Sequence, residues 1–314
     1  MTATRFPFPM PYGWFVACRL DEVPEATPHS LELVGTELVV WRPEAGAEPS
    51  VFEAFCPHLG AHFGVGGRVE GGCLVCPFHE WTFATDGTNE SIPYADRPNR
   101  KARVRTYPTT VRNGFVLFWY HPDPDVAPQW EIPELVPDDF VLAGANEWRV
   151  RSAWQEIAEN AVDMAHFTSV HGLTRVGDIG ELTIDGHRRT IRSTQSFNTA
   201  RGTFEGSIEA NSHGPGLGVT HFDLMGRVTL LSSTTPVSEG EVVVRFTMFH
   251  SPDDIGAKIA APFSEEVRRQ FEQDIPIWES KRYVPSPALA PSERPVTEFR
   301  RWASQFYATP AAEG

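Results

Sequence analysis

Two short segments that each pair a cysteine with a histidine place the strongest constraint on how this chain can fold. The first reads Cys56-Pro-His58 and the second reads Cys76-Pro-Phe-His79. Thiolate and imidazole are side-chain groups that bind zinc and iron readily. We therefore predict a metal site in the first third of the chain, and the fold has to bring both segments to one point.

Zinc and an iron–sulfur cluster both fit this set of side chains. Tetrahedral zinc accepts two cysteines and two histidines, but in zinc fingers cysteine usually pairs with cysteine. In a Rieske [2Fe–2S] cluster, two cysteines hold one iron and two histidines hold the other. One of each from both segments supplies that set, so we predict that Cys56, His58, Cys76 and His79 bind a [2Fe–2S] cluster. Cys18 and Cys73 have no role in this scheme and are expected to be small buried residues.

A second group of candidate ligands lies in the sequence ENAVDMAHFTSVH, which spans residues 159–171. The apolar residues of 151–166 have helical spacing, and Asn160, Asp163 and His166 are three apart on that helix, so they share one face. His171 follows just beyond it. Two histidines and one carboxylate are the ligand set of non-haem Fe(II) oxygenases, which leaves coordination positions open for O₂. The sequence therefore predicts a mononuclear Fe(II) centre that includes His166 and His171.

The carboxylate ligand of this iron is expected to come from elsewhere in the chain. Asp274 is our choice, because it lies on an apolar helical segment where an unpaired acid is costly. Glu272, Glu279 and Asp163 are the alternatives. The helical segment is predicted over residues 264–283, with Ser264 as its N-cap and a kink at Pro276.

Strand and turn signals divide the chain into two parts. Residues 31–41 and 51–55 read as strands, and Asp86-Gly87 and Asn113-Gly114 are hairpin turn signals. Five prolines in residues 121–139 predict a surface connection. Strand patterns return over residues 181–250. We expect residues 1–130 to form an all-β cluster domain and residues 131–314 to form a catalytic domain, which makes the fold class α+β.

Composition excludes several classes of function. The formal net charge of −14 argues against nucleic acid as a partner. No apolar run is long enough to predict a membrane span, and prolines near the N-terminus argue against an export signal, so a cytoplasmic location is expected. The glycine-rich sequence GVGGRVEGG lacks the G-x-G-x-x-G spacing of a dinucleotide site. Electrons therefore have to come from a separate protein.

The chain resembles the Rieske-type non-haem iron oxygenases, specifically their oxygenase component, over nearly its whole length. The sequences CPHLGAHFGVGG and CPFHEWTF match the cluster motif, and ENAVDMAHFTSVH matches the iron motif. The opening YGWFVACRLDEV and the later run DIPIWESKRYVPSPAL look like the Neverland-type cholesterol 7-desaturases. The 3-ketosteroid 9α-hydroxylases are similar in organisation.

This resemblance implies a catalytic domain of helix-grip type, in which an antiparallel sheet wraps around a long helix. It implies that His166, His171 and Asp274 hold the iron and that Asp163 bridges the two metal centres, with Asn160 beside them. It further implies a homotrimer in which the two centres meet across the interface between subunits. The residues expected to line an apolar pocket are Phe222, Leu224, Leu230, Phe246 and Met248.

The function that follows is an oxygenase that uses O₂ and electrons from NAD(P)H to hydroxylate or desaturate a C–H bond. The electrons are expected from a separate reductase, directly or through a ferredoxin. The substrate is expected to be a large apolar molecule, a steroid or sterol. One alternative is an oxygenase acting on an aromatic ring or a methyl ether. An alternative of another class is a non-catalytic Rieske electron-transfer protein.

Overall fold

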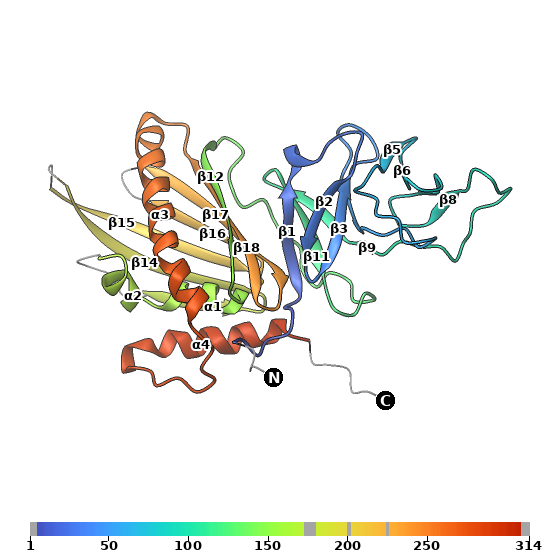
Figure 1. Ribbon diagram of the computed structural model, residues 1–314. Coiled ribbons are helices and arrows are strands. Elements are labelled where there is room, and N and C mark those ends of the chain that lie inside the picture. The colour runs from blue at the N-terminus through green and yellow to red at the C-terminus, as the bar shows by residue number, and fades with distance from the viewer. Residues whose placement is uncertain (1–4, 173–179, 200–201, 224–225, 309–314) are drawn as a thin grey trace. The chain divides into compact units, whose positions relative to one another are not determined.

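The computed structural model describes residues 5–172, 180–199, 202–223 and 226–308 (Figure 1). The chain forms two compact units. One spans Trp14–Glu131 and is called here the N-terminal unit. The other joins the residues up to Gly13 to everything from Ile132 onward and is called the C-terminal unit.

Three small sheets make up the N-terminal unit, with strand orders β1-β11-β10, β2-β3-β4-β9 and β5-β6-β7-β8. Its strands are β1 (Gly13–Arg19), β2 (His29–Leu33), β3 (Thr36–Trp41), β4 (Ser50–Glu53), β5 (Arg68–Glu70), β6 (Cys73–Val75), β7 (Thr82–Phe83), β8 (Asn89–Ser91), β9 (Thr106–Tyr107), β10 (Thr109–Arg112) and β11 (Phe115–Tyr120). A single 3₁₀ turn, Leu20–Glu22, follows β1. The described part of this unit therefore has the all-β character that the sequence predicts.

Tight turns set the register of this unit. Asn113 and Gly114 both have positive φ, 47° and 78°, as the two central residues of a type I′ hairpin turn require. Val34 and Gly35 make a similar turn between β2 and β3. Residues 31–41, read as one strand from their alternation, are thus a hairpin, and that part of the prediction is wrong. Alternation continues across a two-residue turn, which is why the pattern alone misses it.

In its described residues, the C-terminal unit is built on a seven-stranded sheet with the order β12-β18-β17-β16-β15-β14-β13, and every pair in it is antiparallel. The strands are β12 (Val141–Val150), β13 (Glu181–Asp185), β14 (Arg188–Thr199), β15 (Gly202–His213), β16 (Leu217–Asp223), β17 (Arg227–Ser238) and β18 (Glu241–His250). The helix α3 (Asp254–Ser280) crosses one face of this sheet and packs on β12, β17 and β18 (Figure 1). This arrangement confirms the predicted α+β class.

The helix predicted over residues 151–166 is wrong as a single element. It consists of α1 (Trp154–Glu159), a 3₁₀ turn at Asn160–Val162 and α2 (Ala165–Ser169). The break lies at Asp163, whose backbone is extended. Its Oδ1 accepts hydrogen bonds from the N–H groups of Ala165 and His166, at 3.1 and 3.3 Å. A short acidic side chain that bonds the following N–H groups competes with a continuous helix and starts a new one instead.

The start predicted for the later helix is also wrong, because α3 begins at Asp254 rather than after Ser264. Asp253 is its N-cap, and its side chain accepts from the N–H groups of Ile255 and Gly256. The helix runs through Pro262 and Pro276 as one element. None of the described helices is long and apolar enough to cross a membrane.

A buried ion pair ties α1 to α4 (Arg294–Ala303), the last helix of the unit, which lies between the 3₁₀ turns Pro291–Glu293 and Ser304–Phe306. Arg300 donates through Nε and Nη2 to both carboxylate oxygens of Glu159, at 2.6 and 3.0 Å. The two side chains are only 16% and 11% exposed. Removing one partner of such a pair leaves an uncompensated charge in a dry place.

We predict that Arg300→Met lowers the free energy of unfolding of the C-terminal unit by about 3 kcal/mol. The matched control is Arg294→Met, which breaks the exposed pair between Arg294 and Glu298 on the same helix and should cost about 0.5 kcal/mol or less. Thermal unfolding followed by circular dichroism measures both. Equal effects of the two variants would show that burial of the Arg300 pair contributes nothing.

Candidate metal centres

The two cysteine–histidine segments fold into a pair of matching loops. The N–H of Cys56 donates to the carbonyl of Ala61 and the N–H of Cys76 to that of Trp81, both at 2.9 Å. The carbonyls of the two cysteines accept from Gly60 and Glu80, four residues further on. Each loop is thus closed by the same two bonds, although one carries Cys-x-His and the other Cys-x-x-His.

The fourth residue after each cysteine has a left-handed backbone. In the first loop Gly60 has φ 75°, which costs a glycine nothing. In the second loop Glu80 has φ 57°, an uncommon conformation for a residue with a side chain. Arg68 holds the Glu80 carboxylate at 3.0 Å from a neighbouring strand. Backbone strain of this kind persists only where the surroundings fix it and is concentrated at functional sites.

Both cysteines lie in the buried core of the N-terminal unit beneath these loops, 2% and 1% exposed for Cys56 and Cys76. Burial, with a smaller contribution from the neighbouring Cys76 thiol, raises the pKa of Cys56 to about 12. A thiol whose pKa is raised in this way loses its proton readily to a metal cation that replaces it. The pair fits a metal ligand role and does not fit a solvent-exposed redox thiol.

The rings of the two histidines, His58 and His79, lie 4.8 Å apart. The His58 ring stacks on Trp81 at 4.2 Å, which fixes its plane. The buried Nδ1 of His79 has no hydrogen-bond partner among the described residues. An unpartnered buried ring nitrogen is what a missing metal leaves behind. By contrast, Nδ1 of His62 accepts from the N–H of Gly64, so that ring nitrogen is already used.

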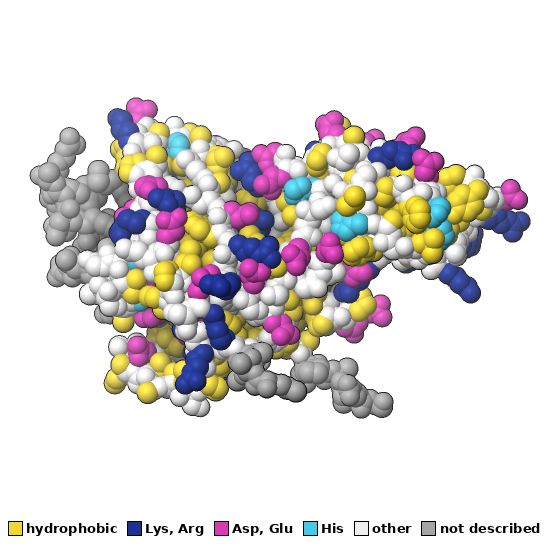
Figure 2. All heavy atoms as spheres, viewed as in Figure 1, with side chains coloured by type: hydrophobic (Ala, Val, Ile, Leu, Met, Phe, Trp, Pro, Cys, Tyr) yellow, Lys and Arg dark blue, Asp and Glu magenta, His cyan; other side chains and the backbone are white. Residues whose placement is uncertain are grey.

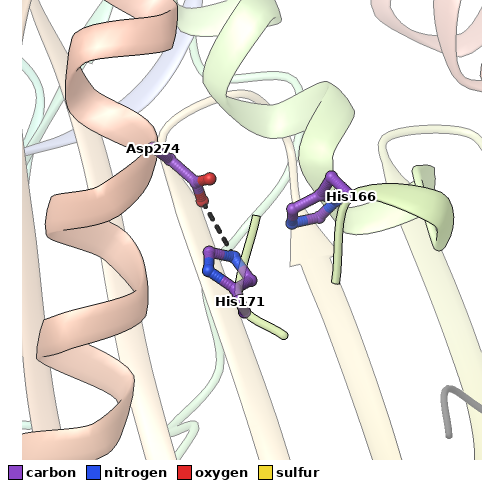
Figure 3. Close-up of side chains that lie close together, drawn as sticks. All are labelled: His166, His171 and Asp274. Carbon is purple, nitrogen blue, oxygen red and sulfur yellow. Dashed lines mark ion pairs between the residues drawn. The ribbon is translucent and has the colours of Figure 1, made fainter. Parts of the chain in front are cut away.

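A second cluster of candidate ligands lies in the C-terminal unit, where His166, His171 and Asp274 point toward one another (Figure 3). One ligand atom from each lies within 4.8 Å of the others. His166 belongs to α2, His171 follows that helix, and Asp274 comes from α3. Asp274 is 6% exposed and His171 is 8% exposed. The structure therefore brings together three residues that are more than a hundred positions apart at the extremes.

Hydrogen bonds on the far side of each imidazole decide which nitrogen faces the centre. Nδ1 of His166 donates to the backbone carbonyl of Asp163, and Nδ1 of His171 donates to Oε1 of Gln273 at 3.0 Å. Because both partners are acceptors, the protons lie on Nδ1 and the Nε2 lone pairs point inward. Gln273 is a residue that sequence reasoning missed, and its only signal is its position next to Asp274.

The side chains that face the centre of this cluster offer more hydrogen-bond acceptors than donors. Nε2 of His171 lies 3.4 Å from Oδ2 of Asp274. Among the described residues, Asn160 is the side-chain amide donor there: it gives a 3.0 Å bond to Oδ2 of Asp274 and also lies 3.4 Å from Nε2 of His166. Burial raises the pKa of Asp274, and the nearby histidines oppose that rise. Two imidazole lone pairs and a carboxylate at one buried point require a cation, and this donor set suits Fe(II).

The other carboxylates weighed for this site lie elsewhere or point elsewhere. Glu272 pairs with Arg268 at 2.6 Å and Glu279 pairs with Arg151 at 3.1 Å. Asp163 accepts through Oδ1 from the first two N–H groups of α2 and is not one of the three clustered residues, and its side chain is 36% exposed.

A cavity of about 300 Å³ opens beside the three clustered residues, between the inner face of the sheet and helices α1, α3 and α4. Leu230 and Phe246 line it, as the sequence predicts. Phe222 and Met248 do not, and that part of the prediction is wrong. The Phe222 ring contacts Phe263 of α3, with centroids 4.7 Å apart, and Met248 is buried in the same hydrophobic cluster. Leu224 lies outside the described residues.

Comparison with protein families agrees with both centres. Residues 13–108 match the Rieske [2Fe-2S] domain, and residues 118–307 match the 3-ketosteroid 9α-hydroxylase C-terminal domain. The chain is 32% identical to the cholesterol 7-desaturase nvd of Bombyx mori, over 97% of this chain and 71% of the relative. It is also 32% identical to a 3-ketosteroid-9-alpha-monooxygenase oxygenase component of Rhodococcus rhodochrous, over 94% of this chain and 80% of the relative.

Solved structures with the same fold include dicamba monooxygenase bound to dicamba, with a TM-score of 0.75 and 17% identity over 94% of this chain and 96% of that one. NdmA of Pseudomonas putida CBB5 with caffeine has a TM-score of 0.76 and 18% identity, over 93% of this chain and 89% of that one. With both domain families matched in order and a catalytic-domain match over more than half its length, the chain belongs to the Rieske non-haem iron oxygenases, as an oxygenase component that carries a [2Fe–2S] cluster and a mononuclear iron.

Proposed function

We propose that this oxygenase hydroxylates or desaturates a C–H bond of a steroid or sterol. The observation that carries the proposal is the cavity beside His166, His171 and Asp274, whose walls are mostly apolar and whose volume of about 300 Å³ is at the lower end of small-molecule sites. The two relatives named above, a cholesterol desaturase and a ketosteroid monooxygenase, act on this class of compound by name.

The proposed ligands follow from the geometry of the two centres. Cys56 and Cys76 would hold one iron of the cluster and His58 and His79 the other. His166, His171 and Asp274 would hold the mononuclear iron. When bound, these groups supply single electrons and the activation of O₂ for attack on a C–H bond.

The chain's own contribution is to orient ligands and keep the site dry. Gln273 and the Asp163 carbonyl hold the protons on Nδ1 of the two histidines, so that Nε2 of each ring stays free to bind. Asn160 orients the carboxylate of Asp274. Aromatic side chains from three helices, Trp154, Phe271 and Trp302, line the cavity and make its wall apolar, which disfavours water there.

Two other functions make different measurable predictions. An electron-transfer protein would hold only the two irons of the cluster, whereas the oxygenase holds one more per chain. The buried hydrogen-bond acceptors around Asp274 favour the oxygenase over the electron-transfer protein. An oxygenase of aromatic rings or methyl ethers would share every metal ligand. Turnover of a substrate panel that contains sterols, ketosteroids, aryl methyl ethers and arenes separates that alternative from ours.

We also propose that the protein acts in the cytoplasm, with electrons from NAD(P)H through a separate reductase, directly or through a ferredoxin. Exposed hydrophobic side chains near the cluster loops support docking there, since Leu59, Phe78 and Tyr94 are 65%, 61% and 63% exposed. Figure 2 shows hydrophobic side chains gathered with histidine at one end of the N-terminal unit. We keep residues 1–130 and 131–314 as the proposed domains.

The first prediction tests the cluster ligands. Cys56→Ala should abolish the visible absorption of the protein, because it removes one of two thiolates from the cluster. Absorption and iron analysis measure the result. Cys73→Ala is the matched control, since Cys73 lies at the start of β6 outside the proposed ligand set and should leave the spectrum intact. A colourless wild-type protein that contains zinc would contradict the assignment.

The second prediction tests the carboxylate ligand. Asp274→Ala should lower the iron content by one per chain and abolish turnover, while the cluster spectrum stays unchanged, because the two sites are in different units. Glu272→Ala is the control, because Glu272 lies on the same helix but pairs with Arg268. Loss of iron in the control and not in Asp274→Ala would exclude Asp274 as a ligand.

The third prediction concerns Asp163 as the bridge between centres in a homotrimer. Because Oδ1 accepts from the first two N–H groups of α2, the test variant is Asp163→Asn, which keeps an acceptor for these bonds and changes the charge. Turnover should fall about 10- to 100-fold with both metal centres retained. Asp253→Asn, the same change at the N-cap of α3, should leave turnover unchanged.

A mixing experiment tests whether electrons cross between chains. Co-expression of Cys56→Ala with Asp274→Ala should restore part of the activity, because some interfaces then join an intact cluster to an intact iron site. Size-exclusion chromatography and differential tags establish that mixed oligomers form. Mixed oligomers without activity would contradict transfer between subunits.

A further inference from the structure

The cavity beside the iron ligands has a buried arginine in its wall. Arg189 lies on β14 and is only 4% exposed. Its side chain lines the same cavity as His166, His171 and Asp274. The rest of the wall is mostly apolar, so a cation at this position requires a reason.

The surroundings of Arg189 hold the guanidinium without neutralising it. Its central carbon lies 4.8 Å from the ring of Phe299 and 5.0 Å from that of Trp302, so both rings of α4 contact the cation. Nη2 donates to Oγ of Ser212 at 3.1 Å. Nε and Nη1 have no hydrogen-bond partner among the described residues.

No carboxylate of the described residues pairs with Arg189. Burial lowers its pKa to about 10, and no charged neighbour contributes to that change. At neutral pH the side chain therefore remains a cation. Arg300 provides a contrast within the same unit: although less buried, it has the Glu159 carboxylate as a bidentate partner. A buried cation with unused hydrogen-bond donors lowers the stability of the fold unless an anion binds to it.

A row of small inward-facing residues leads from Arg189 toward the iron ligands. In register across the sheet, Arg189 pairs with Ser212, Ser212 with Gly218, Gly218 with Ser232 and Ser232 with Phe246, and all five line the cavity. A Cβ at Gly218 would lie 2.7 Å from Oγ of Ser232, so the row has no room for larger side chains there.

The far end of this row meets the helix that carries Asp274. Phe246 contacts Phe271 of α3, with ring centroids 4.7 Å apart, and Phe271 lies one turn before Asp274. Four strand spacings separate Arg189 from Phe246, which is roughly 19 Å. A long, flat apolar molecule can lie along the row with one end at each site.

We propose that Arg189 binds a carboxylate at one end of the substrate, so that the substrate is a steroid- or sterol-derived acid whose ring system lies along the row. The steroid ring system in this inference rests on the proposed function. The carboxylate does not, because it is inferred from the surroundings of Arg189. It assigns Arg189 a role in specificity: the carboxylate accepts hydrogen bonds from donors that no described residue uses, and its charge neutralises the cation. A neutral sterol supplies neither.

Binding measurements on the metal-loaded protein test this role without turnover. The probes are 3-oxo-4-cholenoic acid and its methyl ester, which share a ring system and differ in charge. Calorimetry should show that the wild-type protein binds the acid about 10- to 100-fold more tightly than the ester. Arg189→Met should remove this preference, and Arg189→Lys, which keeps the charge, should retain part of it.

Arg192→Met is the matched control. Arg192 lies on the same strand but is exposed and pairs with Glu209 and Glu181, so this variant should keep the wild-type preference. Equal binding of acid and ester by the wild-type protein, or a preference that survives Arg189→Met, overturns the inference. If Arg189→Met does not fold, the wild-type comparison and Arg189→Lys still decide.

Turnover assays with the same probes separate this inference from the proposed function. Oxidation of neutral ketosteroids together with equal binding of acid and ester would overturn the role of Arg189 and leave the proposed function standing. Arg189-dependent binding of the acid without oxidation of any steroid or sterol would overturn the proposed function and the steroid ring system of the substrate, and would leave only the carboxylate-binding role of Arg189.

Discussion

The organisation of the C-terminal unit depends on one electrostatic constraint: two imidazole nitrogens and a carboxylate, all electron-pair donors to a metal, lie close together at a buried position. Nε2 of His166, Nε2 of His171 and the carboxylate of Asp274 converge at a buried point, and Asn160 donates to the carboxylate. Such a set is stable only around a cation. The position of α3 on the sheet brings Asp274 to residues far earlier in the chain.

Much of the metal chemistry could be predicted from the sequence because it resides in short local patterns. Cys56 and His58, like Cys76 and His79, are near neighbours in the chain, so their types and spacing suffice. Asp274 is one of four candidate acids in the sequence, and the apolar segment around it favours it. Selecting it over Glu272 and Glu279 on geometry requires the structure, since all three lie within eight residues and only their partners distinguish them.

The wrong sequence-based predictions have a common physical origin. The periodicity of apolar residues indicates which face of an element a residue occupies, but it does not indicate where the element breaks or which neighbour a side chain contacts. The helix over residues 151–166 breaks at Asp163 because one carboxylate oxygen bonds two backbone N–H groups, a preference that apolar spacing does not register. Phe222 is on the predicted inner face, yet it packs on Phe263 rather than lining the cavity. Arg189 was missed because a cation in a strand pattern ordinarily indicates the exposed face.

Adjacent residues of α3 serve the same imidazole from different sides, and this fixes the rotation of the helix. Gln273 accepts from Nδ1 of His171, and Asp274 lies 3.4 Å from Nε2 of the same ring. Successive residues on an α-helix point about 100° apart, so only one rotation of α3 satisfies both nitrogens. The helix therefore orients the ring and supplies the carboxylate beside it in a single turn. Its packing on β12, β17 and β18 then transmits the same rotation to the cavity wall, where Phe271 meets Phe246.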